Sequence, residues 1–298
     1  MRYQHTLKQE VTISGIGLHT GRMINMRLKP APRDTGIIFI RTDKGNAEIK
    51  ACVNSVVDTT FATNLGFNGV RVGTVEHLLS ALAGLNIDNL YVELDGSEVP
   101  IMDGSAFVFT QKITETGIAK QAKKISCLRI IKPFSIEEEF CQIAVTPYEG
   151  TKVTYRVHHN HPAFGEQKMS IDITGTNFIN ELAPARTYGF LKDVNLLRSK
   201  GLARGGSLEN ALVLGENGLI NKNKLRFKDE FVRHKILDAI GDISLLGLPI
   251  YGHIIANKAG HALNIKFIKK LLSFKDAWEI VSEPHISHHS SSALVASI

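Results

Sequence analysis

The stretch Phe231-Val-Arg-His234-Lys-Ile-Leu-Asp238-Ala-Ile-Gly-Asp242 spaces one histidine and two aspartates four residues apart. Apolar residues recur around it at helical intervals, which predicts a helix over residues 229–246. At about 3.6 residues per turn, positions four and eight apart share one face. The opposite face is apolar and predicts contact with a core: Val232, Ile236, Ala239, Ile240 and Ile243. The polar face suits a metal ion, although such a row alone is more often a solvated group of charges.

A second helix is predicted over Thr74-Val-Glu76-His77-Leu-Leu-Ser-Ala-Leu-Ala-Gly84, with Thr74 as N-cap and Gly84 as C-terminal stop. Its buried stripe consists of Val75, Leu78, Leu79 and Leu82. His77 points away from that stripe, so it is not simply a core histidine. Taken alone, Glu76-His77 reads more simply as a surface pair.

Together the two helices supply the donors of a catalytic zinc site. Such a site needs three protein ligands and one open position. His77, His234 and Asp238 would provide two imidazoles and one carboxylate. Glu76, next to a ligand, stands where a general base for the attacking water is needed. A third patch contains His261, which by itself would be an ordinary loop histidine.

Strand-like segments surround both predicted helices and indicate an α+β fold. They cover residues 23–28, 36–40, 89–94, 127–131, 142–145, 153–157 and 250–255. The polar, basic residues 117–126 are the candidate linker. We therefore expect two domains of similar topology, residues 1–120 and 127–281, with the active site between them. The serine- and histidine-rich residues 282–298 form an expected mobile tail.

Composition narrows the function classes. The chain has 298 residues, of which 43% are hydrophobic, and its net charge is +6. Three widely spaced cysteines fit a reduced, cytoplasmic protein. No signal peptide and no membrane-spanning run is evident. The positive charge fits an anionic substrate or the anionic inner leaflet. Basic residues are dispersed and aromatic residues make up 7%, so no nucleic-acid partner is expected.

Six motifs occur here in the order found in one family. They are Gly15-Ile-Gly-Leu-His19-Thr-Gly21, Thr74-Val-Glu-His77, Pro100-Ile-Met-Asp-Gly-Ser105, Ala185-Arg-Thr-Tyr-Gly-Phe190, the Phe231–Asp242 stretch and Gly260-His-Ala-Leu-Asn264. Over residues 3–280 the chain closely resembles the UDP-3-O-acyl-N-acetylglucosamine deacetylases. These are zinc amidases that commit a sugar nucleotide to lipid A synthesis in Gram-negative bacteria. The resemblance implies the same two-domain α+β fold.

Carried over by position, the resemblance agrees with the residues' own chemistry. It places the family's zinc ligands at His77, His234 and Asp238, its general base at Glu76 and its histidine acid at His261. It also implies an oxyanion-facing hydroxyl at Thr187 and a substrate-facing lysine at Lys235. The segment 58–63 lacks the cysteine that some relatives carry there.

Asp242 shares a helix face with two expected ligands, so its position alone would allow it to bind the metal as well. It lies two turns beyond His234, about 12 Å by helix rise, and one ion with bonds of ~2 Å cannot reach both ends of that row. The resemblance places Asp242 where the family orients its histidine acid. We therefore expect Asp242 to hydrogen-bond His261 and to favour its protonated form.

The resemblance also implies a channel for an acyl chain and a place for the nucleotide. Residues 194–202, which include Gly201, are the candidate channel together with Gly205 and Gly206. His158, His159 and His161 would lie near the nucleotide, with an ordinary surface loop as the alternative. The tail histidines His285, His288 and His289 are a candidate for adventitious metal binding.

The expected reaction is therefore hydrolysis of the 2-acetamido group of an acylated UDP-sugar, with Zn2+ as cofactor. The expected protein is a cytoplasmic monomer, with peripheral contact to the inner membrane. Two other classes stay open at this point. Another zinc hydrolase, such as a peptidase, would use the same ligands without an acyl channel. A nucleic-acid-binding protein would bind oligonucleotides with steep salt dependence and would be indifferent to chelators.

Overall fold

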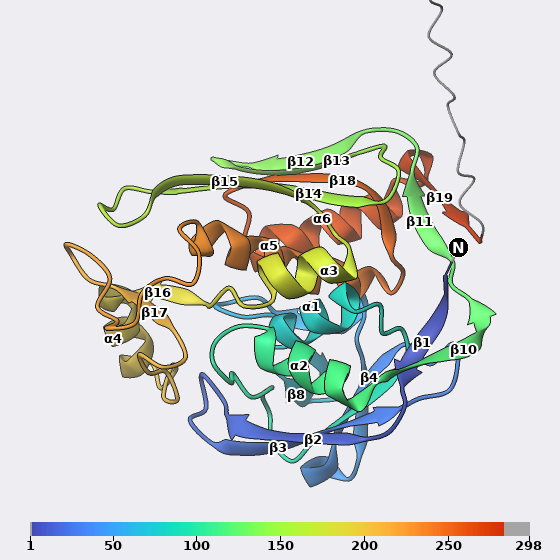
Figure 1. The fold of residues 1–298 in the computed structure, drawn as a ribbon, viewed down its shortest axis with the longest axis horizontal. Helices are drawn as coiled ribbons and strands as arrows, with labels where there is room; N and C mark the ends of the chain where they lie inside the picture. The colour runs from blue at the N-terminus through green and yellow to red at the C-terminus, as the bar shows by residue number, and fades with distance from the viewer. Residues whose placement is uncertain (1, 283–298) are drawn as a thin grey trace, which may run out of the picture.

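The computed structural model describes residues 2–282. Their helices and strands stack as sheet, helices, helices, sheet (Figure 1). The helices are α1 (Glu76–Gly84), α2 (Phe107–Thr116), α3 (Gly175–Asn177), α4 (Leu191–Ser199), α5 (Glu230–Ile243) and α6 (His261–Ser273). The α+β class expected from the sequence is confirmed.

The first part of the chain builds a five-stranded sheet. Its order is β2 (Val11–Ile16), β3 (Met23–Pro30), β9 (Leu90–Leu94), β4 (Ile37–Arg41) and β5 (Ala47–Lys50). Apolar and polar residues alternate along β3, so Ile24, Met26 and Leu28 are buried while their neighbours face outward. Helix α2 packs against β2, and α1 packs against α2. A small sheet of β6 (Val56–Asp58), β7 (Asn64–Phe67) and β8 (Val70–Val72) lies beside strands β4 and β5 of the five-stranded sheet.

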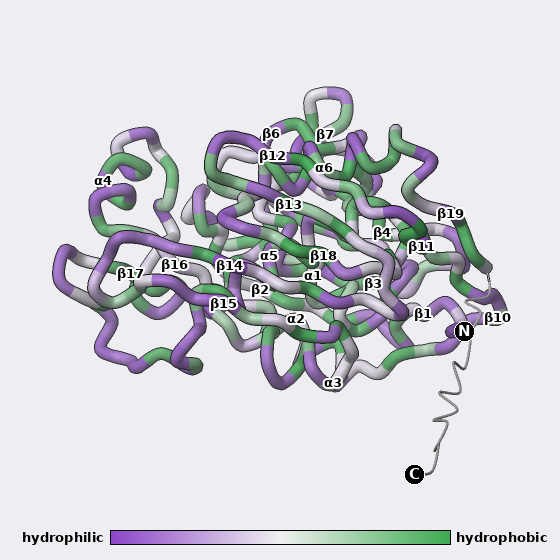
Figure 2. The backbone as a smooth tube through the Cα atoms, turned by 90° about the horizontal axis from the view of Figure 1, so that it is seen from above, coloured by the Kyte–Doolittle hydropathy of each residue, from purple (hydrophilic) through white to green (hydrophobic). Residues whose placement is uncertain are grey.

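The second part builds a seven-stranded sheet around β18 (Ile250–Asn257). Its other strands are β11 (Cys127–Ile130), β12 (Phe134–Glu138), β13 (Cys141–Thr146), β14 (Thr151–His159), β15 (Gly165–Asp172) and β19 (Trp278–Val281). Helix α5 packs on β14 and β15, and α6 packs on β12 and β13. The parallel pair β16 (Tyr188–Phe190) and β17 (Leu212–Leu214) lies with α4 at one end of the molecule (Figures 1 and 2).

Helices α1 and α5 pack directly against each other, which joins the two layered parts. Gly241 is required for this approach, because a Cβ added there would lie 2.1 Å from the carbonyl oxygen of Glu76. The first turn of α1 therefore lies against the C-terminal half of α5. This contact brings two distant segments of the sequence to one place.

Two local predictions were wrong. Thr74 is not an N-cap: it has φ +55° and its hydroxyl donates to Glu98 Oε1, so α1 begins without a side-chain cap. Residues 118–124 are not a linker but β10 (Ile118–Lys124), which pairs with β1 (Tyr3–Leu7). Its polar side chains are compatible with a two-stranded sheet whose outer face meets solvent.

On the polar face of α5, burial excludes the alternative of a solvated row of charges. The helix is buried on almost every side, and Asp242 has no exposed surface. His158 and His159 also belong to a strand, since β14 extends to His159. The division into domains at residues 120 and 127 stays a prediction. The tail histidines lie outside the described residues.

Within residues 2–282, no helix has both the length and the apolar character that a bilayer crossing requires.

Candidate metal centre and active site

His77, His234 and Asp238 converge where α1 meets α5. One ligand atom from each lies within 4.8 Å of the others, and all three side chains are buried. Asp238 Oδ1 is 3.3 Å from His234 Nε2 and 3.6 Å from His77 Nε2. The two imidazole rings stand edge to face, with centroids 4.9 Å apart. The structure thus brings together the three predicted ligands.

The orientation of His234 leaves one nitrogen free for a metal. Its Nδ1 donates a hydrogen bond to the carbonyl oxygen of Ala185 at 3.0 Å, because a carbonyl can only accept. Nε2 therefore carries the lone pair and faces Asp238. Burial lowers the pKa of His234 to about 3, so the ring is neutral. A neutral imidazole fixed by a second hydrogen bond is the form that binds zinc.

Lys235 holds the other ligand of α5. Its Nζ donates to Asp238 Oδ2 at 2.8 Å, which leaves Oδ1 directed toward the histidines. Burial would raise the pKa of Asp238, but His234 and Lys235 hold it well below its usual range. Burial would lower the pKa of Lys235, but the charge of Asp238 raises it. Both side chains are thus charged. Lys235, which was expected to face the substrate, contacts the predicted metal ligand Asp238.

The donor set fits a zinc ion. In the part of the chain that the structure describes, Asp238 Oδ1 and His77 Nδ1 are buried without a hydrogen-bond partner. Leaving a buried carboxylate oxygen unpaired is unfavourable, and a bound cation would satisfy it. Two imidazoles and one carboxylate are a common ligand set of catalytic zinc.

Glu76 lies beside this triad and is buried. Its Oε2 accepts a hydrogen bond from the backbone N–H of Thr63 at 3.1 Å, and its Oε1 is 3.9 Å from His261 Nε2. Burial raises the pKa of Glu76, although the charges of His261 and His77 oppose the rise. A carboxylate with a raised pKa is a better proton acceptor at neutral pH than an ordinary one.

His261 begins α6 and is held by Asp242, with Nδ1 to Oδ2 at 2.8 Å. The hydrogen bond expected from the sequence is present. Burial would lower the pKa of His261, but the charge of Asp242 and this hydrogen bond raise it to about 9. The ring is therefore protonated at neutral pH, with Nε2 directed toward Glu76.

Thr63 and Asn264, whose roles the sequence did not indicate, complete the surroundings of Asp242. The Thr63 hydroxyl donates to Asp242 Oδ1 at 2.5 Å, and the Asn264 amide donates to Oδ2 at 2.9 Å. Thr63 thus connects Asp242 to Glu76 through its hydroxyl and its N–H. The segment 58–63 was noted only for its lack of cysteine, and nothing local indicated this role.

Thr187 is positioned by a buried ion pair that the sequence analysis also missed. Glu230, at the start of α5, accepts hydrogen bonds from Arg186 Nε at 2.8 Å and from the Arg186 backbone N–H at 3.0 Å. The next residue, Thr187, donates its own N–H to Gly104 at 2.7 Å. These contacts and the His234–Ala185 bond attach the segment 185–187 to α5.

Glu98 anchors the glycine-rich loop at residues 17–21. It accepts from the N–H groups of His19 and Thr20 at 2.8 and 2.9 Å, and from the Thr74 hydroxyl at 2.9 Å. This carboxylate ties the loop to the residue two positions before Glu76. Both ring nitrogens of His19 are buried without a partner among the described residues, and burial lowers its pKa.

The residues expected to contact the nucleotide and the acyl chain do not touch His77, His234 or Asp238 directly. His159 packs against Phe164 and Phe190, and burial lowers its pKa. His161 Nε2 donates a hydrogen bond to the carbonyl oxygen of Gly215, because a carbonyl oxygen can only accept. Residues 194–202 fall largely in α4, whose Leu191 and Leu196 side chains are exposed. Their roles toward substrate stay predictions.

The arrangement has the parts of a metal-assisted hydrolase. It contains a buried ligand set, a carboxylate beside it that accepts a proton, and a protonated imidazole opposite that carboxylate. An amide needs both an activated water and a proton for the leaving amine. The geometry is compatible with that chemistry.

Comparison with known proteins agrees with the geometry. A family model described as UDP-3-O-acyl N-acetylglycosamine deacetylase matches residues 4–273. The chain is 52% identical over 295 residues to the UDP-3-O-acyl-N-acetylglucosamine deacetylase of Thermodesulfovibrio yellowstonii, covering 99% of this chain and 100% of that protein. The proteins of the same name from Syntrophotalea carbinolica and Acidithiobacillus ferrooxidans are 46% and 49% identical, over 98% and 93% of this chain and 94% and 92% of theirs. With a match that extends over nearly the whole sequence, the chain belongs to the UDP-3-O-acyl N-acetylglycosamine deacetylase family.

Proposed function

We propose that this chain is a zinc-dependent amidohydrolase. It removes the N-acetyl group of a UDP-3-O-(3-hydroxyacyl)-N-acetylglucosamine and releases acetate, an early committed step of lipid A biosynthesis. The observation that carries the proposal is the position of Glu76 and His261 beside the buried triad of His77, His234 and Asp238. The names of its relatives support the substrate.

The triad would hold the ion, and Lys235 keeps Asp238 charged for it. When bound, zinc lowers the pKa of a coordinated water toward ~7 and polarises a carbonyl. Glu76 takes the proton of the attacking water as the new C–O bond forms. The Thr187 hydroxyl donates a hydrogen bond to the oxygen on which negative charge develops.

Collapse of this tetrahedral species breaks the C–N bond. His261 gives its Nε2 proton to the leaving nitrogen, since an unprotonated amine anion is a poor leaving group. Asp242 keeps the ring oriented and stabilises its charged form. The products are acetate and the free amine, and the proton held by Glu76 returns to solvent or to His261.

The remaining parts of the proposal follow from the substrate. The acyl chain lies along α4 and residues 200–206, and the nucleotide lies near the end of β14. The protein acts as a cytoplasmic monomer that contacts the inner membrane peripherally, because its substrate carries an acyl chain and its net charge is +6.

The test is direct hydrolysis. The purified chain is incubated with the acylated UDP-sugar, and acetate and free amine are quantified before chelation, after chelation and after zinc is restored. We expect equal amounts of both products, loss with chelator and recovery with zinc. A chain that cleaves peptides but leaves the sugar nucleotide intact would contradict the proposal.

A further inference from the structure

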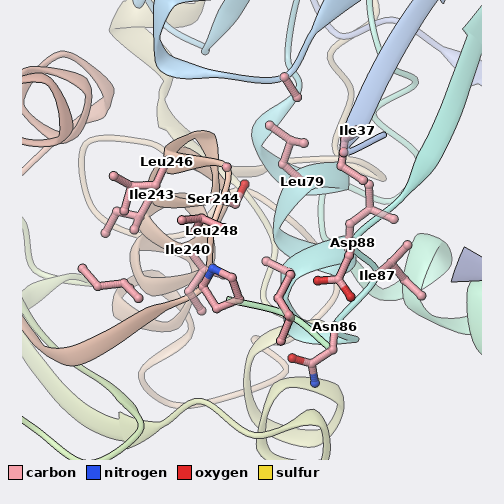
Figure 3. Close-up of a pocket in the computed structure, with 18 of the residues that line it drawn as sticks. Ile37, Leu79, Asn86, Ile87, Asp88, Ile240, Ile243, Ser244, Leu246 and Leu248 are labelled. Atoms are coloured by element: carbon pink, nitrogen blue, oxygen red, sulfur yellow. The ribbon is translucent and has the colours of Figure 1, made fainter. Parts of the chain in front are cut away.

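A cavity of about 470 Å3 lies between the C-terminal halves of α1 and α5. Figure 3 shows Leu79 and Ile37 facing Ile240, Ile243 and Leu246 across it. None of the triad, Glu76, Asp242 or His261 lines it, and neither does any residue of α4. The cavity is therefore separate from both the candidate active site and the expected acyl channel.

The walls of the cavity are aliphatic. Leucine, isoleucine, valine, alanine and proline side chains line its interior, and no aromatic residue is among the described residues that form it. Polar residues such as Thr151 and Ser244 also line it, but their hydroxyls already donate to the carbonyl oxygens of Ile250 and Gly241. The apolar walls offer no aromatic surface for stacking. They favour a flexible aliphatic chain over a planar or polar ligand.

The rim of the cavity is polar, and its acidic groups are engaged. Asp88 binds Arg2 through two hydrogen bonds of 2.5 and 2.7 Å. Asp34 binds Lys123 at 2.7 Å. Lys50 at the end of β5 also lines the cavity, is exposed, and forms no ion pair among the residues that the structure describes. The rim thus keeps one uncompensated positive charge.

We propose that this cavity binds a single-chain aliphatic amphiphile with an anionic head group, the chemistry of a long-chain fatty acid. The chain lies between Leu79 and Ile243, and the head group lies at Lys50. The volume is roughly three times the ~150 Å3 of a dry cavity that holds benzene, which corresponds to a chain of roughly 14 to 18 carbons. The proposal is independent of the deacetylase activity, because it concerns binding alone.

The probe is sodium hexadecanoate, used below its micellar range with the full chain, and binding is measured by equilibrium dialysis. We expect the cavity to add one saturably bound molecule per chain to any that the proposed acyl channel along α4 holds, and we expect much weaker binding of octanoate in the cavity. Lys50→Glu should weaken binding roughly tenfold through reversal of the charge at the rim. Lys44→Glu, the same change at an exposed lysine outside the cavity, should leave binding unchanged.

Two further variants locate the bound chain. Leu246→Trp fills the cavity and should remove one bound molecule per chain, whereas Leu196→Trp in α4 should leave that molecule in place. If Leu246→Trp does not fold, Ala83→Leu reduces the cavity from the opposite helix and makes the same test. Absence of saturable binding would overturn the proposal, and so would a number of bound molecules per chain that is the same in Leu246→Trp as in the parent. Binding lost only in Leu196→Trp would place the chain at α4 and also overturn it.

Discussion

Asp242→Asn separates the charge of Asp242 from its hydrogen bonds. The asparagine oxygen can take the place of Oδ2 and accept from His261 and Asn264, which lie at 2.8 and 2.9 Å. Its amide group then faces Thr63, whose hydroxyl can accept instead of donate. The variant therefore keeps the geometry and removes one negative charge.

The size of the effect follows from the pKa of His261. That pKa is about 9, against an ordinary value of 6.5. At about 1.36 kcal/mol per pH unit, the difference corresponds to about 3 kcal/mol in favour of the charged ring. Because other carboxylates remain nearby, we expect the variant to lose part of this, a fall in the pKa of roughly one to two units.

The assay is the pH dependence of kcat/KM together with zinc content. A residue that must be protonated loses activity above its pKa, so the basic limb of the profile should move to lower pH in Asp242→Asn. Zinc content should stay unchanged. Asp229→Asn, which removes a half-buried carboxylate paired with Arg233 just before α5, is the matched control and should leave the limb in place. An unmoved basic limb, or lost zinc, would refute the assignment of Asp242.

Three other outcomes are expected. Glu76→Ala should keep its zinc, lose roughly 10²–10⁴-fold in kcat and lose the acidic limb of its pH profile, whereas His261→Ala should lose the basic limb; if both keep a symmetric bell, other groups titrate. Gly241→Ala should lower stability by about 1–3 kcal/mol and weaken zinc binding, because the added carbon meets the Glu76 backbone; thermal unfolding that matches Gly218→Ala, whose site is open, would contradict this. In the metal-free protein, the contribution of His261 to stability is complete below about pH 6.5 and is lost as pH rises through about 9; thermal melts of Asp242→Asn that keep the wild-type slope over this range would disprove it.

Local periodicity predicted the parts of this structure that depend on nearby residues. The i, i+4 spacing of His234 and Asp238 placed both side chains on one helix face, and α5 has that face. Alternation of apolar residues likewise predicted β3 and β14, because successive side chains of a strand point to opposite faces. The motifs and their order predicted the family.

Contacts between distant segments could not be predicted in this way. Thr63 and Asp242 are 179 positions apart, and only the packing of α1 on α5 brings them together. Thr74 resembles a cap in sequence, yet Glu98 holds its hydroxyl in another conformation. The polar residues of β10 were predicted to form a linker, because nothing close in sequence indicates a partner strand. Their partner is β1, which lies more than 100 positions earlier in the chain.

The most direct test of the account is the zinc content of Asp238→Ala, measured by elemental analysis in a chain from which the tail histidines have been removed. Asp238 Oδ1 is the buried carboxylate oxygen between the two imidazoles, and two histidines alone hold a catalytic ion poorly. The parent protein should contain about one zinc per chain and Asp238→Ala almost none, while the matched control Asp229→Ala keeps the full amount. A full complement of zinc in Asp238→Ala would contradict the account.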